Sequence, residues 1–390
     1  MEIGQPGLVR TITLENFLSF GAAGATIPLG PLNVIIGPNG AGKSNLLESI
    51  ELLRNVPEQL LKPIREGGGV RYWLWKGARK LPVASLDVVL AHPRGNNLRY
   101  RLSFTAIEFR FEMLDERVEN EHPEPGSFYY HFNGGRPVLN VKKEKSILLL
   151  RREDIDVERS ILAQRRDPDQ YPEITWLAEA FAKIRLYREW SFGRYTAPRL
   201  PQRADLPNDM LEPDASNLGL VLNRLRRDPA VKARVLEALR VLYDGIDDYD
   251  VQIEGGTVQV FLQEGPFTVP ATRLSDGTLR YLCPLAILCH PNPPPLLCIE
   301  APELGLHPDV LPALAGLLKE ASTRCQLIVT THSDILVDAM TDTPESVLVC
   351  EKKEGATTLS RLSAEDLRPW LERYRLGELW TRGEIGGTRW

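Results

Sequence analysis

Short segments of alternating or continuous hydrophobic residues predict strands near the start of the chain. Alternation over 8–14 and a short, mainly apolar run over 32–36 that ends at glycine predict two strands. From 44 to 54 apolar residues recur at helical spacing, until Pro57 ends the pattern. Glycine is frequent between the second strand and this helix, so the expected order is strand, glycine loop, helix.

The middle of the chain changes from a strand pattern to a helical one. Strand-like runs at 84–90, 98–104 and 128–132 are separated by Gly, Pro and Asn, which predicts an antiparallel sheet over about 80–142. From about 153 to 245 the pattern is mostly helical and interrupted by prolines. No heptad pattern continues over three or four repeats, which argues against a long coiled-coil arm.

Strands and helices alternate in the final third. Strands are expected at 251–262, 296–299 and 326–330, with helices after Asp276 and from Asp309. This alternation is typical of a mainly parallel sheet covered by helices. We therefore expect an α/β protein whose main domain is split in sequence. Its expected parts are residues 1–150 with the glycine loop and the antiparallel sheet, a helical lobe at 151–250, and a second half at 251–390.

The glycine loop fits the pattern G-x-x-x-x-G-K-[ST] and stands between a predicted strand and a predicted helix. Its glycines let backbone N–H groups turn toward a phosphate, and the helix N-terminus adds positive potential. Lys43 is expected to reach the β and γ phosphates of ATP, and Ser44 to hold Mg²⁺. The loop alone does not distinguish kinases, GTPases and ATPases. The expected ATP-binding residues are Gly37, Pro38, Asn39, Gly40, Ala41, Gly42, Lys43, Ser44 and Asn45.

A second motif, Leu274-Ser275-Asp276-Gly277-Thr278, stands at an expected helix start before strand 296–299. It resembles the signature of ABC ATPases, L-S-G-G-Q, in the L-S-D-G-T form of RecF-like soluble ATPases. A helix N-terminus with a serine hydroxyl and glycine N–H groups forms an anion site. The resemblance implies that this anion is the γ-phosphate held by a partner subunit. The alternative is an ordinary helix N-cap.

The run 296–300 has the Walker B pattern, apolar residues followed by an acid, and Glu300 is expected in the Mg²⁺ shell. In the ABC class the next residue is a glutamate that polarises the attacking water, whereas here it is Ala301. Losing a general base costs about 10²–10⁴ in rate, so we expect ATP binding with severely reduced hydrolysis. Two explanations are open, an introduced glutamate-to-alanine substitution and a natural lineage without the base. The other motifs are intact, which favours the first. Glu303 is expected to point elsewhere.

Other ABC elements are expected outside these three motifs. His332, in Thr-Thr-His-Ser after strand 326–330, is expected to be the switch histidine that contacts the γ-phosphate. His307 lies where the class has its D-loop, or only caps the next helix. Gln164 is the candidate for the glutamine that senses Mg²⁺. Asn16, with Phe17, is the candidate for the adenine platform, although core packing explains Phe17 equally well.

Composition sets limits on the class of protein. With 43% hydrophobic residues, 25% charged residues and a net charge of −5, the chain is globular and not coated in basic charge. No apolar window approaches a membrane span, and the start lacks a signal-peptide core, so a cytoplasmic protein is expected. The five cysteines are expected to be small core residues. Arginines cluster at 151–152, 165–166 and 224–227, on solvated helix faces or against nucleic acid.

Taken together, these motifs resemble the stand-alone ABC-type ATPases, relatives of RecF, SMC proteins and the ATPase half of OLD nucleases. The resemblance also rests on 16–20, Tyr187 to Trp190, Asn217-Leu218 and 377–380. It implies an ABC-type P-loop ATPase head, with a mainly parallel sheet, an antiparallel β subdomain and an inserted helical lobe.

The resemblance further implies a Mg-ATP-driven homodimer that acts on DNA in genome maintenance or anti-phage defence, or controls an effector such as a Toprim-type nuclease. The alternative is a non-hydrolysing, ATP-dependent dimerisation module without direct DNA binding. A transporter subunit is less favoured, because the P-loop and the signature are too far apart in sequence.

Overall fold

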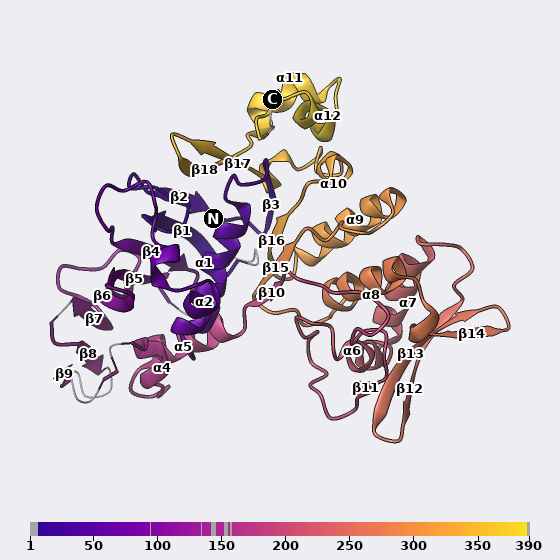
Figure 1. Ribbon diagram of the computed structural model, residues 1–390, viewed down its shortest axis with the longest axis horizontal. Helices are drawn as coiled ribbons and strands as arrows, with labels where there is room; N and C mark the ends of the chain where they lie inside the picture. The colour runs from indigo at the N-terminus through magenta and orange to yellow at the C-terminus, as the bar shows by residue number, and fades with distance from the viewer. Residues whose placement is uncertain are drawn as a thin grey trace. The chain divides into compact units, whose positions relative to one another are not determined.

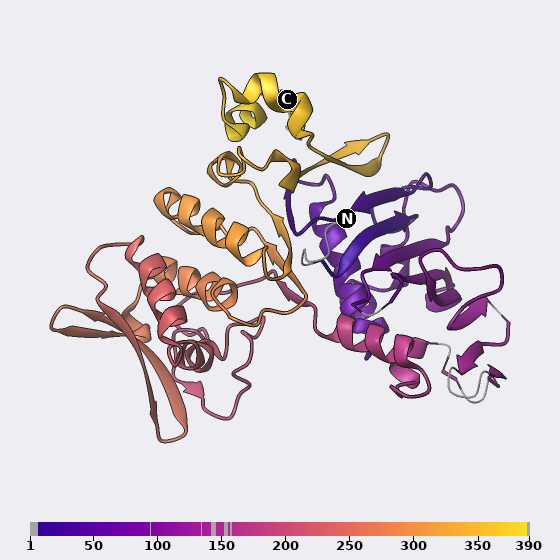
Figure 2. The ribbon, with the colours of Figure 1, turned by 180° about the vertical axis from the view of Figure 1, so that it is seen from behind.

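The chain folds into two compact units, each assembled from segments that are distant in sequence. The computed structural model describes residues 7–93, 95–133, 135–141, 146–151, 155–156 and 158–387. Unit 1 comprises Met1–Arg185, Glu345–Leu362 and Gly383–Trp390. Unit 2 comprises Leu186–Pro344 and Ser363–Arg382. Both units are drawn in Figure 1, and from behind in Figure 2. Within the described ranges, no helix has the length and apolar character needed to cross a membrane.

Unit 1 contains an eight-stranded antiparallel sheet, which confirms the sheet expected over about 80–142. The strand order is β2-β1-β4-β5-β6-β7-β8-β9. The sheet is larger than expected because the strand near 8–14 joins it as β1, antiparallel to β4. One side of the sheet is covered by α5 (Pro172–Ala182), whose Phe181 packs edge-on against Tyr100 with ring centroids 5.5 Å apart. The strands are β1 (Val9–Glu15), β2 (Ala25–Pro28), β4 (Ala84–Leu90), β5 (Leu98–Ile107), β6 (Arg110–Asn120), β7 (Tyr130–Asn133), β8 (Val138–Val141) and β9 (Ser146–Leu149).

A second group of strands in unit 1 carries the glycine loop. Strand β3 (Leu32–Ile36) is buried at all five positions, Asn33 included, which explains its mainly apolar sequence. It pairs in parallel with β17 (Val347–Lys353), and β17 pairs antiparallel with β18 (Ala356–Arg361). Helix α1 (Lys43–Asn55) follows the glycine loop and packs against α2 and α5. The shorter helices of this unit are α2 (Leu61–Glu66), α3 (Val70–Trp73) and α4 (Ile161–Gln164).

Unit 2 contains the expected alternation of strands and helices. Strands β15 (Leu296–Glu300) and β16 (Gln326–Thr330) are parallel, with Glu300 opposite Thr330. Parallel strands end at the same edge, so the polar residues that follow each strand come together there. The helices of the unit are α6 (Leu218–Leu225), α7 (Pro229–Arg240), α8 (Asp276–Leu288), α9 (Leu311–Ala321), α10 (Asp334–Asp338), α11 (Ala364–Leu371) and α12 (Leu376–Thr381).

The single strand expected over 251–262 is wrong, because the segment is an antiparallel hairpin. Strands β12 (Asp248–Glu254) and β13 (Thr257–Glu264) meet at Gly255-Gly256. These glycines have φ of +56° and +78°, and a two-residue turn of the type I′ class requires positive φ at both positions. The remaining short elements are β10 (Arg185–Tyr187), β11 (Gln202–Arg203), β14 (Phe267–Pro270), η2 (Ala271–Arg273), η3 (Pro308–Val310) and η4 (Pro344–Ser346).

Candidate functional site

The glycine loop in unit 1 has a backbone that only glycine adopts easily. Gly37, Gly40 and Gly42 have φ of +147°, +80° and +115°. A Cβ on Gly37 would lie 2.1 Å from the carbonyl oxygen of Cys350, and one on Gly42 would lie 2.2 Å from Thr357 Oγ1. Two of the three glycines are therefore required by close packing against β17 and β18 as well as by their φ.

Lys43 and Ser44 begin the helix that follows the loop. The Lys43 side chain is largely buried, and its Nζ donates to the carbonyl oxygens of Gly37 at 2.7 Å and Pro38 at 3.2 Å. Burial raises the pKa of Cys350 to about 12, an effect that the charge of Lys43 opposes. Ser44 is exposed in the first turn of α1. The ammonium group thus lies within the loop, and the serine is accessible to solvent.

A hydrogen-bond network that sequence reasoning missed supports this loop from behind. Ser19 Oγ accepts a hydrogen bond from Asn45 Nδ2 at 2.6 Å and lies 2.7 Å from Thr357 Oγ1. The Thr357 hydroxyl lies 2.6 Å from the carbonyl oxygen of Ala41, to which it donates. Asn45 and the segment 16–20 were singled out from the sequence, but Thr357 had no signal because it lies 338 residues after Ser19.

Asn16 and Gln164, the candidates of unit 1 outside the glycine loop, have local structural roles. The backbone of Asn16 turns the chain with φ of +51°, and its carbonyl oxygen accepts from Trp75 N at 2.9 Å. The amide of Gln164 accepts from Asp156 N at 2.8 Å and donates to the carbonyl oxygens of Asp156 and Arg159. A role for Gln164 toward Mg²⁺ stays a prediction, and it requires these bonds to break.

In unit 2 the signature motif forms the N-terminus of α8. Ser275 is the N-cap and accepts from Thr278 N at 3.0 Å, so the helix-cap interpretation is confirmed as part of the structure. Ser275 and Asp276 are exposed, whereas Leu274 is buried. A Cβ on Gly277 would meet no heavy atom closer than 3.7 Å. The fold of this chain therefore does not require glycine there.

A buried arginine that sequence reasoning missed holds the signature loop in place. Arg199 is 8% exposed. Its guanidinium donates to the carbonyl oxygen of Leu274 at 2.5 Å and to Gly193 at 3.1 Å, and it forms an ion pair with Asp276. Charged donors make strong hydrogen bonds, so Arg199 fixes the residues on both sides of Ser275.

The Walker B strand ends with its acid held by a basic side chain. Arg188 Nε donates to Glu300 Oε2 at 2.9 Å, and both side chains are about one quarter exposed or less. Arg188 was part of the family motif in the sequence, without an assigned role. The ion pair neutralises the carboxylate that is predicted to serve Mg²⁺.

Ala301, at the expected general-base position, directly follows this strand. Its φ is +47°, in the left-handed region that non-glycine residues rarely adopt. Its N–H donates to the carbonyl oxygen of Thr330 at 3.0 Å and lies 3.2 Å from Thr330 Oγ1. The ends of β15 and β16 thus fix the position of Ala301.

Glu303 and His332, which lie beyond the ends of β15 and β16, are hydrogen-bonded to one another. Glu303 is 9% exposed, and its Oε1 accepts from the backbone N–H of His332 at 2.8 Å. The expectation that Glu303 points elsewhere agrees with this bond, because the carboxylate supports the histidine loop. His332 itself is exposed. His307 caps η3, with Nδ1 accepting from Asp309 N at 3.3 Å.

The other family motifs fix loops of unit 2. The Tyr187 hydroxyl donates to the carbonyl oxygen of Leu211 at 2.8 Å. Asn217 donates to Met210 O at 2.8 Å, which explains the Asn-Leu motif as a loop anchor. At Gly377 an added Cβ would lie 2.3 Å from a backbone oxygen of α10, so close packing requires glycine. The expectation that the cysteines are small core residues is confirmed, since all five are buried and none forms a disulfide.

Several arginines of the clusters noted in the sequence form hydrogen bonds or ion pairs within the chain. Arg224 donates to Asn208, and Arg226 forms an ion pair with Asp250. Arg166 donates to the carbonyl oxygen of Pro57, and Arg152 lies outside the described residues.

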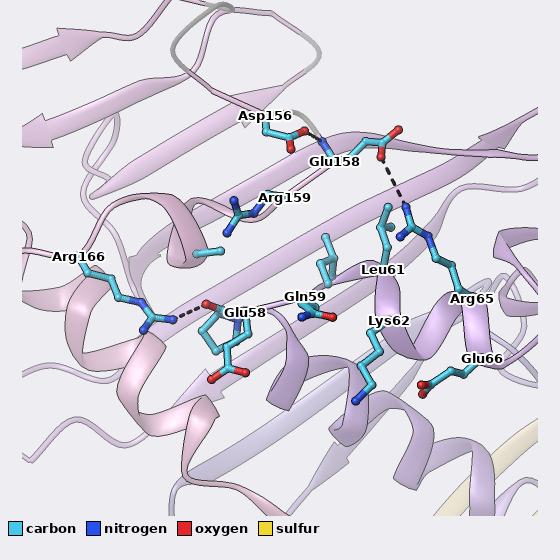
Figure 3. Close-up of a pocket in the computed structure, with 13 residues that line it drawn as sticks. Glu58, Gln59, Leu61, Lys62, Arg65, Glu66, Asp156, Glu158, Arg159 and Arg166 are labelled. Carbon is cyan, nitrogen blue, oxygen red and sulfur yellow. Dashed lines mark hydrogen bonds and ion pairs between the residues drawn. The ribbon is translucent and has the colours of Figure 1, made fainter.

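Arg166 also lines a pocket of about 900 Å³ between α2 and the segment 156–166, shown in Figure 3. No residue of the glycine loop lines this pocket. Its charge is balanced, with four carboxylates and four basic side chains, so it does not favour a polyanion. These eight residues are Glu58, Glu66, Asp156, Glu158, Lys62, Arg65, Arg159 and Arg166.

The site residues therefore divide between the units. The glycine loop, Asn16 and Gln164 belong to unit 1, and the signature, Glu300, Ala301 and His332 belong to unit 2. The roles of both groups toward a nucleotide, and their meeting in one site, stay predictions.

Comparison with known proteins identifies the class to which this arrangement is similar. Residues 32–338 match a family model described as "AAA domain, putative AbiEii toxin, Type IV TA system". No curated protein matches the sequence.

Among solved structures, the Smc head bound to the C-winged helix domain of ScpA has a TM-score of 0.59 at 15% identity, covering 92% of this chain and 99% of that one. An Smc head with an extended coiled coil from Pyrococcus furiosus, bound to the C-terminal domain of ScpA, has a TM-score of 0.56 at 16% identity, covering 94% and 98%. One from Pyrococcus yayanosii has 0.53 at 13%, covering 94% and 99%. These likenesses show the fold, which is that of an ABC-type P-loop ATPase head.

Proposed function

The chain belongs to the AAA domain family described as "putative AbiEii toxin, Type IV TA system", and on this basis we propose that it is a Mg-ATP-driven dimerising switch. In this proposal two copies bind head to tail around two nucleotides. One observation carries the nucleotide part. The backbone of Gly37, Gly40 and Gly42 curls around the buried ammonium group of Lys43, which lies at the loop carbonyl oxygens.

The residues of the loop fit a phosphate chain. The backbone N–H groups of its glycines can donate hydrogen bonds to phosphate oxygens, and α1 directs the positive end of its dipole toward the loop. Lys43 would transfer its ammonium from the Gly37 and Pro38 carbonyl oxygens to the phosphate oxygens, and exposed Ser44 would hold Mg²⁺ through its hydroxyl. Bound Mg-ATP would supply the γ-phosphate whose presence the dimer reports.

The signature supports the second subunit's part in this proposal. Ser275 is exposed at the start of a 13-residue helix, and Arg199 fixes the preceding loop. Glycine at 277 is not demanded by packing within the chain, where a Cβ would have ordinary contacts. A close approach of an external phosphate to the 277 backbone gives that glycine a reason, and a partner's nucleotide provides such a phosphate.

We propose that hydrolysis by this chain is strongly reduced, so that the closed dimer persists. Ala301 has no proton acceptor, and the neighbouring carboxylate of Glu303 accepts from His332 N. The glutamate that would serve as base is thus absent from its position. Glu303, two residues further along the chain, already accepts a hydrogen bond from the backbone of the histidine loop.

The partner of the switch is proposed to be an effector protein, a Toprim-type nuclease in DNA maintenance or anti-phage defence. Two of the matched Smc heads are bound to domains of ScpA, so a head of this fold can offer a surface to a second protein. Arg224 and Arg226 already bind other side chains of the protein, which argues against the 224–227 cluster as the nucleic-acid contact. A module that dimerises without hydrolysis or direct DNA contact is the second candidate, favoured by Ala301.

Light scattering with Mg-ATP and with Mg-ADP tests the switch. We expect a doubled mass with ATP only, because ADP lacks the γ-phosphate that Ser275 and Gly277 would bind. Ser275→Phe should block dimerisation while fluorescent-nucleotide binding to the monomer persists. Ser363→Phe is the matched control, since Ser363 caps α11 in the same unit and accepts from Asp366 N at 3.2 Å. Equal mass with both nucleotides, or equal effects of both substitutions, would contradict the proposal.

A further inference from the structure

A short basic segment of unit 1 stands out against the acidic balance of the chain. The whole protein has 47 Lys and Arg against 52 Asp and Glu. Residues 70–83 hold four basic residues and no carboxylate, together with Tyr72. A cluster of one sign in a chain of the opposite net charge indicates a local partner of the opposite charge.

The side chains of this segment are presented to solvent. Arg71, Lys76, Arg79 and Lys80 are all exposed. Tyr72 is 59% exposed, and Phe109, in the turn between β5 and β6, is 80% exposed. Burying a phenylalanine side chain contributes about 1.5–3 kcal/mol to folding, so a phenylalanine this exposed contributes little of that stability. Single exposed apolar residues are common, but here two aromatic rings lie within one basic surface.

Specific contacts bring the segment and the turn together. Arg71 Nε donates to the carbonyl oxygen of Glu108 at 2.5 Å, and its guanidinium lies 4.4 Å from the centre of the Phe109 ring. Thr105 Oγ1 donates to Pro82 O at 2.9 Å, so the other end of the segment runs beside the same hairpin. The hairpin of β5 and β6 is labelled in Figure 1.

The basic groups of this surface keep their charge available. Lys76 Nζ lies 4.4 Å above the ring of Tyr72, a contact that places the cation without neutralising it. The exposed Arg110 follows the turn. Within the described part of the chain, none of these cations forms an ion pair with a carboxylate, although Glu108 and Glu112 are close in sequence. We call the set Arg71, Tyr72, Lys76, Arg79, Lys80, Phe109 and Arg110 the aromatic-basic patch.

We propose that the aromatic-basic patch binds single-stranded nucleic acid. Basic side chains contact the phosphates, and exposed aromatic rings stack on unpaired bases whatever their sequence. A duplex offers phosphates but keeps its bases stacked inside, so it would engage the cations without the rings. This combination favours a single strand over a duplex and over an acidic protein. The proposal concerns a partner of the proposed switch, yet binding at the patch needs neither ATP nor a dimer.

Fluorescence anisotropy of the full-length protein with mixed-sequence single-stranded DNA and RNA of about 20 nucleotides tests the proposal, because one such binding site covers about 4–16 nucleotides. If all five cations contact phosphates, a plot of the logarithm of the binding constant against the logarithm of the salt concentration should have a slope of about −3.5. A duplex of the same sequence should bind more weakly.

Two patch variants separate the contributions of charge and stacking. The double variant Tyr72→Ala with Phe109→Ala should weaken binding about 5- to 150-fold for each base that loses its aromatic stacking partner, and the salt slope should not change. Arg79→Gln with Lys80→Gln should reduce the slope by about 1.4.

Matched controls lie outside the patch. Tyr195→Ala removes a ring that is 80% exposed beside Arg194, and Arg224→Gln with Arg227→Gln removes the charge of a different cluster. Neither control should change binding. The proposal is overturned if the wild type binds no single strand, or if the controls weaken binding as much as the patch variants. It is also overturned if a duplex binds as tightly as the single strand and the variant without the two rings binds like the wild type.

ATP-dependent dimerisation, measured on the same variants, keeps the two proposals distinguishable. Loss of nucleic-acid binding with dimerisation intact supports the patch. Dimerisation without any nucleic-acid binding by the wild type overturns the patch and leaves the switch standing.

Discussion

Replacing Ala301 with glutamate should restore the missing base at the end of β15. The backbone there is already left-handed, with φ of +47°, and alanine already carries a Cβ. A glutamate therefore adds no new backbone strain, and because residue 301 is partly exposed the longer side chain has room toward solvent. The hydrogen bonds from residue 301 N–H to Thr330 involve only the backbone of 301 and persist. We expect the free energy of unfolding to change by less than about 0.5 kcal/mol.

The expected gain in rate follows from what a positioned base contributes. General-base catalysis is worth about 10²–10⁴ in rate, which corresponds to about 3–5 kcal/mol of activation free energy. The 2.9 Å ion pair of Arg188 with Glu300 is present with either residue at 301, so the cost of breaking it is the same in both proteins and cancels from the ratio of their rates. We therefore expect at least about a tenfold increase in steady-state hydrolysis.

Phosphate release at saturating Mg-ATP, with the dimer mass followed by light scattering, measures this effect. Ala301→Gln is the matched control, because glutamine has the size of glutamate without its ability to accept a proton. Ala301→Gly relieves the positive φ and should stabilise the fold by about 1 kcal/mol without raising the rate. An equal increase with glutamine, or no increase with glutamate in an intact dimer, would refute the argument.

Three further predictions address binding, the signature and pH. Lys43→Ala should abolish ATP binding in calorimetric titration, whereas the exposed Lys62→Ala should not. Arg199→Met should lower urea stability by about 2–4 kcal/mol, because it removes charged hydrogen bonds to the Leu274 loop, and should weaken ATP-dependent dimerisation, with Arg199→Lys intermediate. Burial raises the pKa of Glu116 from 4.5 to about 7, so the folded state retains a proton that the unfolded state loses. Stability should fall by about 3 kcal/mol as pH rises between these values, and Glu116→Gln should remove that slope in urea titrations.

The sequence predicts most of the fold because its strongest patterns are local. The strands β3 and β16 begin and end at the expected residues, since a short, mainly apolar segment that is buried along its whole length leaves little choice. The error at 251–262 has an equally local cause. Alternation continues across Gly255-Gly256, and only the paired glycines indicate the hairpin turn.

The candidate site is predicted less completely because its support comes from distant parts of the chain. The glycine loop is recognisable by itself, but Thr357, which holds Ser19 and Ala41, lies on β18 at the other end of the sequence. Arg199 resembles any arginine of a proline-rich loop until its guanidinium is placed against Leu274 O. No local pattern records such long-range hydrogen bonds.

The edge formed by β15 and β16 shows why loss of the base need not mean loss of the switch. Glu303 and His332 are joined by a hydrogen bond that does not involve residue 301, and the Ala301 N–H bonds to Thr330 through the backbone alone. An alanine at 301 thus leaves the support of the histidine loop unchanged. In the proposed switch, sensing of a γ-phosphate by His332 and its cleavage by a base depend on different side chains, so a chain with Ala301 is expected to respond to ATP while scarcely consuming it.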